Sequence, residues 1–307
     1  MRILILGAAG FIGTALCRRL QDEGHDIIAL SRSELQLPML PNCRRIQATL
    51  DDRQVLDATL GEADYVFHLA WDTTPGTSAA QPSLEISNNL LPSMRLLEAM
   101  QERPGLPLAF MSSGGALFGS TADELLHESV PISPSSYYGA GKAAMEHFLG
   151  AFAHRSASPV VLLRASNLYG PGQRPKRQFG LIPTLFDSIL RSRPLEIWGD
   201  GEIVRDFLYI NDFLDLCVRL LTWDAELGKT TALNVGSGCG LSINALCNRI
   251  EAVTGEQLQL LYRPARSVDA DHVTIDNSLA KRLLGWQVRT SIDDGLRQTW
   301  AWIKSLG

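Results

Sequence analysis

Residues 3–13 read Ile3-Leu4-Ile5-Leu6-Gly7-Ala8-Ala9-Gly10-Phe11-Ile12-Gly13. The apolar run Arg2–Leu6 predicts a buried strand, and the periodic stretch Phe11–Glu23 predicts the helix that follows it. Three glycines therefore stand at a strand-to-helix turn, where the backbone can approach a pyrophosphate and the helix N-terminus supplies N–H donors. The turn predicts a dinucleotide site that includes Gly7, Gly10, Phe11, Ile12 and Gly13.

Short apolar runs alternate with helical patterns through the first half of the chain. Further strands are expected at Asp26–Leu30, Arg45–Leu50, Tyr65–Ala70, Leu108–Ser112 and Val160–Arg164, with helices at Leu84–Met100 and Tyr138–Ala153. Such alternation is typical of a parallel sheet with helices on both faces. The predicted fold class is therefore α/β, with a doubly wound parallel sheet.

The regular alternation of strand and helix patterns ends after Asn167. The run Tyr169-Gly170-Pro171-Gly172-Gln173-Arg174-Pro175 predicts a loop, and sheet strands return at Phe207–Ile210 and Leu233–Val235. We therefore expect a dinucleotide-binding domain of residues 1–167 plus about 207–236. A smaller substrate-binding lobe would contain about 168–206 and 237–307.

Composition excludes several classes of partner. The 307 residues are 45% hydrophobic and carry a net charge of −5, so the chain can bury a full core but has no basic footprint for nucleic acid or an anionic membrane. Its five cysteines lack CxxC spacing, which argues against a disulfide framework or a metal site. No apolar window has the length of a membrane span, and we expect a cytoplasmic protein.

Tyr138 and Lys142 are four residues apart on a predicted helix and therefore share one helix face. An ammonium beside a phenol favours the phenolate, so a tyrosine with an ordinary pKa of about 10 can act as an acid or base near neutrality. Together with the upstream glycine turn, the pair predicts a nicotinamide-dependent enzyme. Tyr137 is the better candidate for a packing aromatic.

The GxxGxxG spacing with YxxxK downstream resembles the short-chain dehydrogenase/reductase superfamily. More specific runs resemble its extended branch, the NAD-dependent epimerase/dehydratase family acting on sugar nucleotides: residues 163–172 (Leu-Arg-Ala-Ser-Asn-Leu-Tyr-Gly-Pro-Gly), Gly199-Asp200-Gly201, Arg205-Asp206-Phe207, residues 234–238 (Asn-Val-Gly-Ser-Gly) and Leu284-Gly285-Trp286. The resemblance covers essentially the whole chain. It implies a Rossmann-type fold and chemistry on a nucleoside-diphosphate sugar.

The end of the second strand bears on the choice of nicotinamide cofactor. It reads Ser31-Arg32-Ser33, without the carboxylate that would bind a ribose 2′-OH, and Arg32 offers a planar cationic fork for a 2′-phosphate. We therefore expect NADP(H) in preference to NAD(H), the alternative being that Arg32 is a solvated loop cation. Thr49 also departs from the Asp that related epimerases often have. The resemblance implies cofactor contacts for Leu50, Leu69, Ala70, Trp71 and Asn88.

The family's third catalytic residue, a hydroxyl four residues before the aromatic of its Val-Tyr-Gly motif, falls on Gly114, because Leu117-Phe118-Gly119 occupies that motif. Ser112 and Ser113 precede the glycine, and either can supply the missing hydroxyl. The resemblance also implies an Asp-Glu pair in dehydratases, where this chain has Gly115-Ala116. Without a carboxylate pair for elimination, dehydration is disfavoured.

The resemblance implies further residues on the substrate side and a dimer. Asn167, Arg205 and Arg266 match positions that contact the diphosphate, and Asp269 is the expected acceptor for a sugar or ribose hydroxyl. Surface ion pairs of Arg205 with Asp206, or of Arg266 with Asp269, are the alternative. The helices Leu84–Met100 and Tyr138–Ala153 would form a two-fold four-helix bundle in a homodimer.

Three functions follow from this resemblance. The first is epimerisation at C4 of a nucleoside-diphosphate sugar through a 4-keto intermediate. The alternative is an NADPH-dependent reductase of a nucleoside-diphosphate 4-keto-6-deoxy sugar. A non-catalytic, cofactor-binding redox sensor is a third reading, supported only by Gly114.

Overall fold

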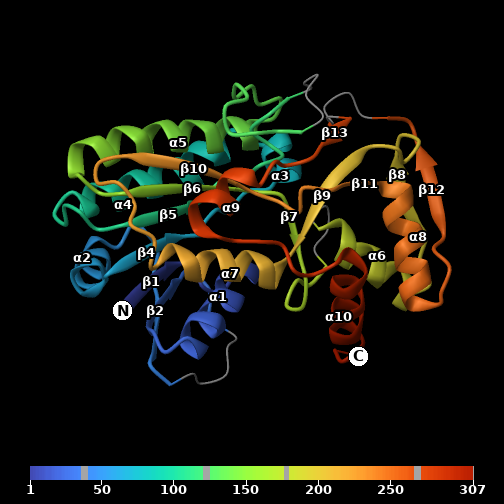
Figure 1. Cartoon of the computed structure of the whole chain (residues 1–307), viewed down its shortest axis with the longest axis horizontal. Helices are drawn as coiled ribbons and strands as arrows, with labels where there is room; N and C mark the ends of the chain where they lie inside the picture. Colours follow the sequence, from blue (N-terminus) through green and yellow to red (C-terminus); the bar gives the residue numbers. More distant parts are fainter. Residues whose placement is uncertain (36–40, 120–124, 176–179, 266–270, 307) are drawn as a thin grey trace. The chain divides into compact units, whose positions relative to one another are not determined.

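The computed structural model describes residues 1–35, 41–119, 125–175, 180–265 and 271–306 (Figure 1). The chain divides into two compact units. The first contains Met1–Ser113, Ser136–Arg164 and Leu216–Leu233, and the second contains Gly114–Ser135, Ala165–Asp215 and Asn234–Gly307. The predicted assignment of cofactor binding to one domain and substrate binding to another stays a prediction.

A seven-stranded sheet organises the first unit within the described residues, in the order β10-β6-β5-β4-β1-β2-β3. Its strands are β1 (Arg2–Leu6), β2 (Asp26–Ser31), β3 (Cys43–Gln47), β4 (Tyr65–His68), β5 (Leu108–Met111), β6 (Val160–Ala165) and β10 (Thr230–Val235). The pairings from β6 to β3 are parallel, with Arg2 opposite Asp26 and Ile3 opposite Tyr65. The strand order reverses beside β1, which confirms the predicted doubly wound, Rossmann-type sheet and marks the switch point where such sheets bind ligands.

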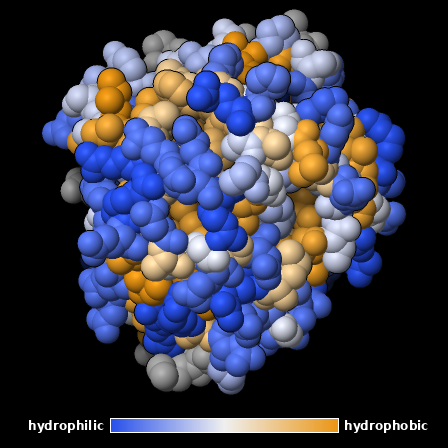
Figure 2. Space-filling model, turned by 90° about the vertical axis from the view of Figure 1, so that its left-hand side faces the viewer, coloured by the Kyte–Doolittle hydropathy of each residue, from blue (hydrophilic) through white to orange (hydrophobic). Residues whose placement is uncertain are grey.

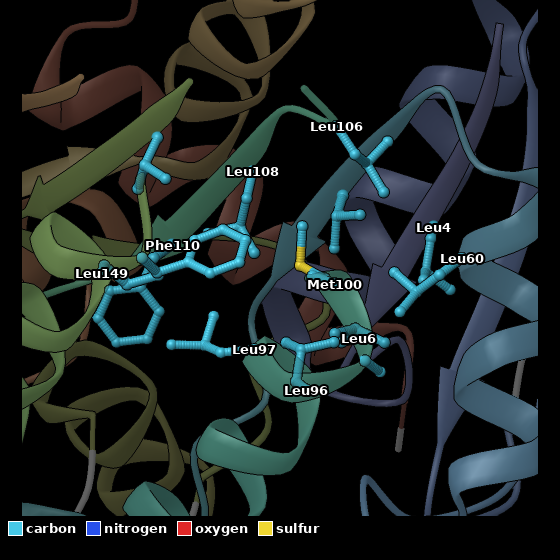
Figure 3. Close-up of a cluster of buried hydrophobic side chains, with 14 of the residues drawn as sticks. Leu4, Leu6, Leu60, Leu96, Leu97, Met100, Leu106, Leu108, Phe110 and Leu149 are labelled. Atoms are coloured by element: carbon cyan, nitrogen blue, oxygen red, sulfur yellow. The ribbon is translucent and has the colours of Figure 1, made fainter. Parts of the chain in front are cut away.

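Helices cover both faces of this sheet because its central strands are buried on both sides; β4 and β6 are buried at every residue. On one face lie α2 (Arg53–Glu62), α4 (Leu91–Met100) and α5 (Tyr137–Ser156), and on the other lies α1 (Phe11–Asp22). Figure 3 shows this core on the first face, which extends from Leu4 of β1 and Leu60 of α2 past side chains of α4 to Phe110 of β5 and Leu149 of α5. Each fully buried leucine or phenylalanine stabilises the fold by roughly 1.5–3 kcal/mol.

The predicted helix Leu84–Met100 is divided in the structure. Its residues form the π-helical turn η1 (Glu85–Leu90), which α4 follows directly. A separate short helix, α3 (Pro75–Ala80), precedes them. The N–H of Leu91 bonds to the carbonyl of Ile86, five residues back, which widens the helix locally. The predicted helix Tyr138–Ala153 begins at Tyr137, because the Ser136 side chain accepts the Gly139 N–H and caps it.

The second unit is built on smaller sheets. One contains β7 (Asn167–Tyr169), β9 (Val204–Tyr209), β11 (Gly240–Ser242) and β13 (His272–Val273), and another pairs β8 (Leu195–Trp198) with β12 (Leu260–Arg263). The helices are α6 (Leu181–Leu190), α8 (Ile243–Thr254), α9 (Ser278–Leu284) and α10 (Ile292–Lys304), while α7 (Ile210–Leu220) belongs partly to each unit. Asp206 of β9 is fully buried, where its carboxylate accepts the N–H groups of Ser237, Gly238 and Ile275.

The surface is largely polar where it is drawn. In Figure 2 hydrophilic residues dominate the visible face, and hydrophobic residues lie among them in separate patches. Within the described ranges, no helix is both long enough and apolar enough to cross a membrane.

Candidate active site

The glycine turn lies at the carboxyl end of β1, as the sequence predicts, and two of its glycines are required by close packing. Gly7 has a φ of 86°, and a Cβ added there would lie 2.8 Å from the backbone nitrogen of Ala70. A Cβ on Gly13 would overlap the Gly7 carbonyl oxygen and lie 2.7 Å from the Ala8 Cα. The helix α1 starts immediately at the turn, with Gly10 as its N-cap and no side chain capping it, so its first N–H groups are available to a ligand at the turn.

The loop after β4 runs alongside this turn. The Leu69 N–H bonds to the Leu6 carbonyl at 2.9 Å, which places Leu69, Ala70 and Trp71 beside the glycines, where they were expected. The Trp71 indole N–H is buried and has no hydrogen-bond partner in the described part of the chain. Because buried donors are normally paired, this group fits a site that is completed by a ligand atom. The glycine turn and the orphaned donor together fit a bound dinucleotide.

The side chains at the end of β2 are engaged by the protein itself. The Ser31 hydroxyl donates to the Ser33 carbonyl. The Arg32 guanidinium forms an ion pair with Asp72, whose carboxylate also accepts from the Asn88 amide at 2.8 Å. The positive charge of Arg32 is thus offset by a neighbouring carboxylate. Leu50, the last cofactor residue expected in this region, is buried in the core of the unit.

Sequence reasoning selected Asn88 and missed its neighbour. Asn88 is exposed, whereas Asn89 is buried and makes three hydrogen bonds. Its side-chain oxygen accepts the Asp72 N–H at 2.7 Å, and its amide donates to the Thr73 hydroxyl at 2.8 Å and to the Glu85 carboxylate at 3.0 Å. Thr73, Glu85 and Asn89 therefore form a buried polar cluster after β4 that no motif indicated.

Tyr138 and Lys142 lie on one face of α5, as their spacing predicts. Lys142 is 2% exposed, its Nζ donates to the Met111 carbonyl at 2.6 Å, and it lies 3.9 Å from the centre of the Trp71 ring. The distance from Nζ to the centre of the Tyr138 ring is 5.7 Å. Three aromatic rings, of Trp71, Phe110 and Tyr138, and a carbonyl thus lie around the ammonium, an arrangement that stabilises a desolvated cation.

The electrostatics of this pair differ from the sequence expectation. Burial lowers the pKa of Lys142 well below its ordinary value, while the carboxylates of Glu85 and Glu146 oppose that change. Burial also raises the pKa of Tyr138, and the Glu85 carboxylate raises it further. We expected Lys142 to lower the pKa of Tyr138, but its ammonium is directed to Met111, and a carboxylate acts on the phenol instead. Burial and the Glu85 carboxylate thus both disfavour the phenolate form of Tyr138.

The two candidate serines after β5 have different surroundings. Ser112 is buried, and its hydroxyl donates to the Glu146 carboxylate at 2.5 Å. Glu146 is also paired with the Arg164 guanidinium at 2.7 Å, so Ser112 belongs to a buried ionic network between β5, α5 and β6. Ser113 is half-buried and follows it. Of the two serines, Ser113 is the better candidate for the missing hydroxyl at Gly114.

The substrate-side candidates belong to the second unit. The Asn167 amide donates to the Asp206 carbonyl at 2.9 Å, which fixes its side chain on β7. Arg205 of β9 is half-buried, and its guanidinium donates to the Val204 carbonyl. The alternative ion pair with Asp206 is disfavoured, because that carboxylate already accepts three backbone N–H groups. Arg266 and Asp269 lie outside the described residues.

A glycine turn at the switch point of a doubly wound sheet, with a tyrosine and lysine pair on a helix of the same unit, defines a Rossmann-type enzyme that uses a nicotinamide dinucleotide. Residues 3–236 match the model of the NAD dependent epimerase/dehydratase family. The chain therefore belongs to that family, as the sequence resemblance indicated.

Relatives with named activities match along the whole chain. A UDP-glucose 4-epimerase of Mycolicibacterium smegmatis is 29% identical over 310 residues, which covers 97% of each chain. The crystal structure of UDP-glucose 4-epimerase with UDP-glucose from Thermotoga maritima is 28% identical, with a TM-score of 0.92 over 100% of this chain and 99% of that one. The UDP-glucuronic acid 4-epimerase of Bacillus cereus, in complex with UDP-glucuronic acid and NAD, is 27% identical, with a TM-score of 0.90 and complete coverage of both chains.

The predicted preference for NADP(H) over NAD(H) is wrong. The family is NAD-dependent, and the Bacillus cereus structure contains NAD. The physical reason lies at the end of β2, where Asp72 offsets the charge of Arg32 and the Ser31 hydroxyl is engaged by the backbone. The groups expected to take a 2′-phosphate already have protein partners. Asp72 is 40 residues from Arg32, so the local sequence could not reveal it.

Proposed function

We propose that the protein is an NAD-dependent 4-epimerase of a UDP-sugar. The observation that carries the proposal is the Tyr138 and Lys142 pair in the same unit as the glycine turn, in a chain whose full-length relatives include UDP-glucose and UDP-glucuronic acid 4-epimerases. A carboxylate pair for elimination is not formed at Gly115-Ala116, so dehydration remains disfavoured.

NAD, when bound, supplies the oxidation of C4 and the reduction that follows it. Tyr138 accepts the proton of the C4 hydroxyl as a ketone forms and returns it as the ketone is reduced, so its ionisation changes twice in one turnover. Lys142 remains buried beside it as a fixed positive charge. Ser113 takes the place of the family's hydroxyl, donating to the C4 oxygen and orienting it toward Tyr138.

The glycine turn would hold the pyrophosphate of NAD at the N-terminus of α1, and Leu69, Ala70 and Trp71 would line the cofactor. We assign Asn89 to this region in addition to Asn88, because its amide organises the loop after β4. In the second unit, Asn167, Arg205, Arg266 and Asp269 are proposed to bind the nucleoside diphosphate and its sugar. Guanidinium groups match phosphate oxygens in geometry and charge.

We also propose that the enzyme is a homodimer. Apolar side chains are exposed on the helices expected to pair: Ile86 and Leu91 on η1 and α4, and Tyr137 and Phe148 on α5. Exposed apolar groups on adjacent helices are typical of surfaces that become buried on association. Two copies of this helix pair would form a four-helix bundle around a two-fold axis.

The direct test of the proposed activity is to incubate the purified protein and NAD separately with UDP-glucose and UDP-glucuronic acid. We expect at least one of these sugars to be converted to its C4 epimer, without net consumption of cofactor. The same protein should be given a nucleoside-diphosphate 4-keto-6-deoxy sugar with reduced cofactor. Stoichiometric oxidation of that cofactor, with no epimer from either UDP-sugar, would identify a reductase and reject the epimerase.

A further inference from the structure

Glu85 is a buried carboxylate in the first unit whose hydrogen-bond partners are neutral. It is 4% exposed, its Oε1 accepts from the Thr73 hydroxyl at 2.6 Å, and its Oε2 accepts from the Asn89 amide at 3.0 Å. Burying a carboxylate is costly unless an opposite charge lies near it. These hydrogen bonds orient the carboxylate but leave its charge to be balanced by another group.

The carboxylate lies against α5 at Gly141, a position between the two residues of the catalytic pair in the sequence. A Cβ added to Gly141 would come within 2.6 Å of the Glu85 Oε2, and Gly141 is one residue before Lys142 and three after Tyr138. Glycine in the middle of a helix is less favourable than alanine. At position 141 the missing Cβ leaves room for the carboxylate.

The local backbone also has an uncommon conformation. Glu85 begins the π-helical turn η1, in which the Leu91 N–H bonds five residues back to Ile86. Such turns are rare and occur often at functional sites. Here the turn contains both Glu85 and Asn89 with their side chains buried, so the widened turn presents two polar groups to α5 and to the loop after β4.

The charged groups around Lys142 come from four elements. Glu146 of α5 already has a cationic partner, the Arg164 guanidinium of β6. His68 of β4 is fully buried, and burial followed by the charge of Lys142 lowers its pKa to about 3, so it is neutral. The remaining carboxylate that acts on Lys142 is Glu85 of η1. Glu85 and Lys142 thus carry opposite charges in one buried region, although no ion pair joins them in the described part of the chain.

We propose that Glu85 is a positioning residue that acts as the counter-ion of Lys142, keeping that buried lysine protonated beside Tyr138. The proposal rests on the proposed function, in which Tyr138 and Lys142 are the catalytic pair. Glu85 also raises the pKa of Tyr138, because a negative charge disfavours both loss of the ammonium proton and formation of the phenolate. Removing the charge lowers the pKa of both groups.

Two substitutions alter the negative charge that Glu85 places near Lys142, by different means, and each has a matched control. Glu85→Gln removes the charge and keeps a side chain that can bond to Thr73 and Asn89, while Glu98→Gln makes the same change at an exposed site on the adjoining helix α4. Gly141→Ala keeps the Glu85 charge, but its new Cβ displaces the Glu85 carboxylate. Because that carboxylate is the end of a flexible side chain, the variant can still fold. Gly150→Ala is its control on α5, where the nearest atom to the new Cβ is the Thr230 hydroxyl oxygen at 3.7 Å.

The first measurement is the titration of Lys142 by NMR of isotope-labelled lysine. The chain has five lysines, and the Lys142 signal is the one missing from Lys142→Met. We expect Lys142 to lose its proton at lower pH in Glu85→Gln and in Gly141→Ala, and at an unchanged pH in both controls. Titration of Lys142 at the native pH in both test variants would overturn the inference.

The second measurement is the pH dependence of kcat with a UDP-sugar. The rate should rise with pH as Tyr138 ionises, because the phenolate accepts the C4 hydroxyl proton. This rise should move to lower pH in Glu85→Gln, so that the ratio of variant to native kcat changes by at least about tenfold across the profile. A uniform loss of kcat with an unchanged profile would show that Glu85 only maintains the fold, and would overturn the inference.

The two measurements separate this inference from the proposed function. Absence of turnover with every UDP-sugar would reject the proposed function, while a shifted lysine titration would still support the effect of the Glu85 charge on Lys142. Turnover with an unshifted titration and an unchanged pH profile would reject the role of Glu85 alone.

Discussion

Adjacent tyrosines on α5 have different surroundings. Tyr137 is 56% exposed, whereas Tyr138 lies close enough to Glu85 for that carboxylate to raise its pKa. We expect Tyr138→Phe to lower kcat by about 10²–10⁴-fold, because it removes the group that transfers the C4 hydroxyl proton. Tyr137→Phe is the matched control and should retain native turnover. Both variants should have the same melting temperature as the native protein. A fully active Tyr138→Phe would reject the catalytic assignment.

The buried pair of Glu146 and Arg164 allows a stability prediction. Their side chains are 3% and 7% exposed, and Ser112 bonds to the same carboxylate. Arg164→Met leaves that carboxylate buried without its cation, so the free energy of unfolding should fall by about 3–5 kcal/mol in denaturant titrations. Arg53→Met breaks the exposed pair with Asp57 and should cost at most about 1 kcal/mol. Equal losses would contradict the account.

At the scale of elements, the strand-turn-helix that opens the chain makes a prediction about cofactor binding. Gly13→Ala places a Cβ against the Gly7 carbonyl and should displace the turn from α1, which lowers the affinity for NAD by at least about tenfold. Gly61→Ala in α2 has only the end of the Arg103 side chain near its new Cβ, at 3.6 Å, and should bind NAD normally. Isothermal titration calorimetry measures both. Unchanged affinity in Gly13→Ala would argue against this turn as the cofactor site.

Elements with strong local signals could be predicted from the sequence, and those that depend on distant partners could not. The glycine turn and the Tyr138 and Lys142 spacing are local, so the strand, the helix and the shared helix face were predicted. The π-helical turn has no periodicity of its own, which is why Asn89 and Glu85 were missed. The direction of Ser112 depends on Glu146, 34 residues away, and the role of Arg32 depends on Asp72.

At the scale of the whole molecule, the alternation of strands and helices predicted the sheet, because each crossover connection must bury its helix on a parallel strand. The assignment of the two units to cofactor and substrate remains a proposal.

The proposed homodimer can be tested by sedimentation velocity. The native protein should have twice the mass of 33.7 kDa, and Phe148→Glu should shift it toward the monomer. A native protein that sediments as a monomer at assay concentration would contradict the proposed dimer.

The central claim is that the protein epimerises C4 of a UDP-sugar by oxidising it and reducing it again within one turnover. The most direct measurement uses a UDP-sugar with deuterium at C4, incubated with the enzyme in ordinary water and a pool of unlabelled NAD. The account predicts that the C4 epimer retains the deuterium, because the atom removed from C4 is the atom returned to it. Epimer that has lost its deuterium to the NAD pool or to water would contradict the account.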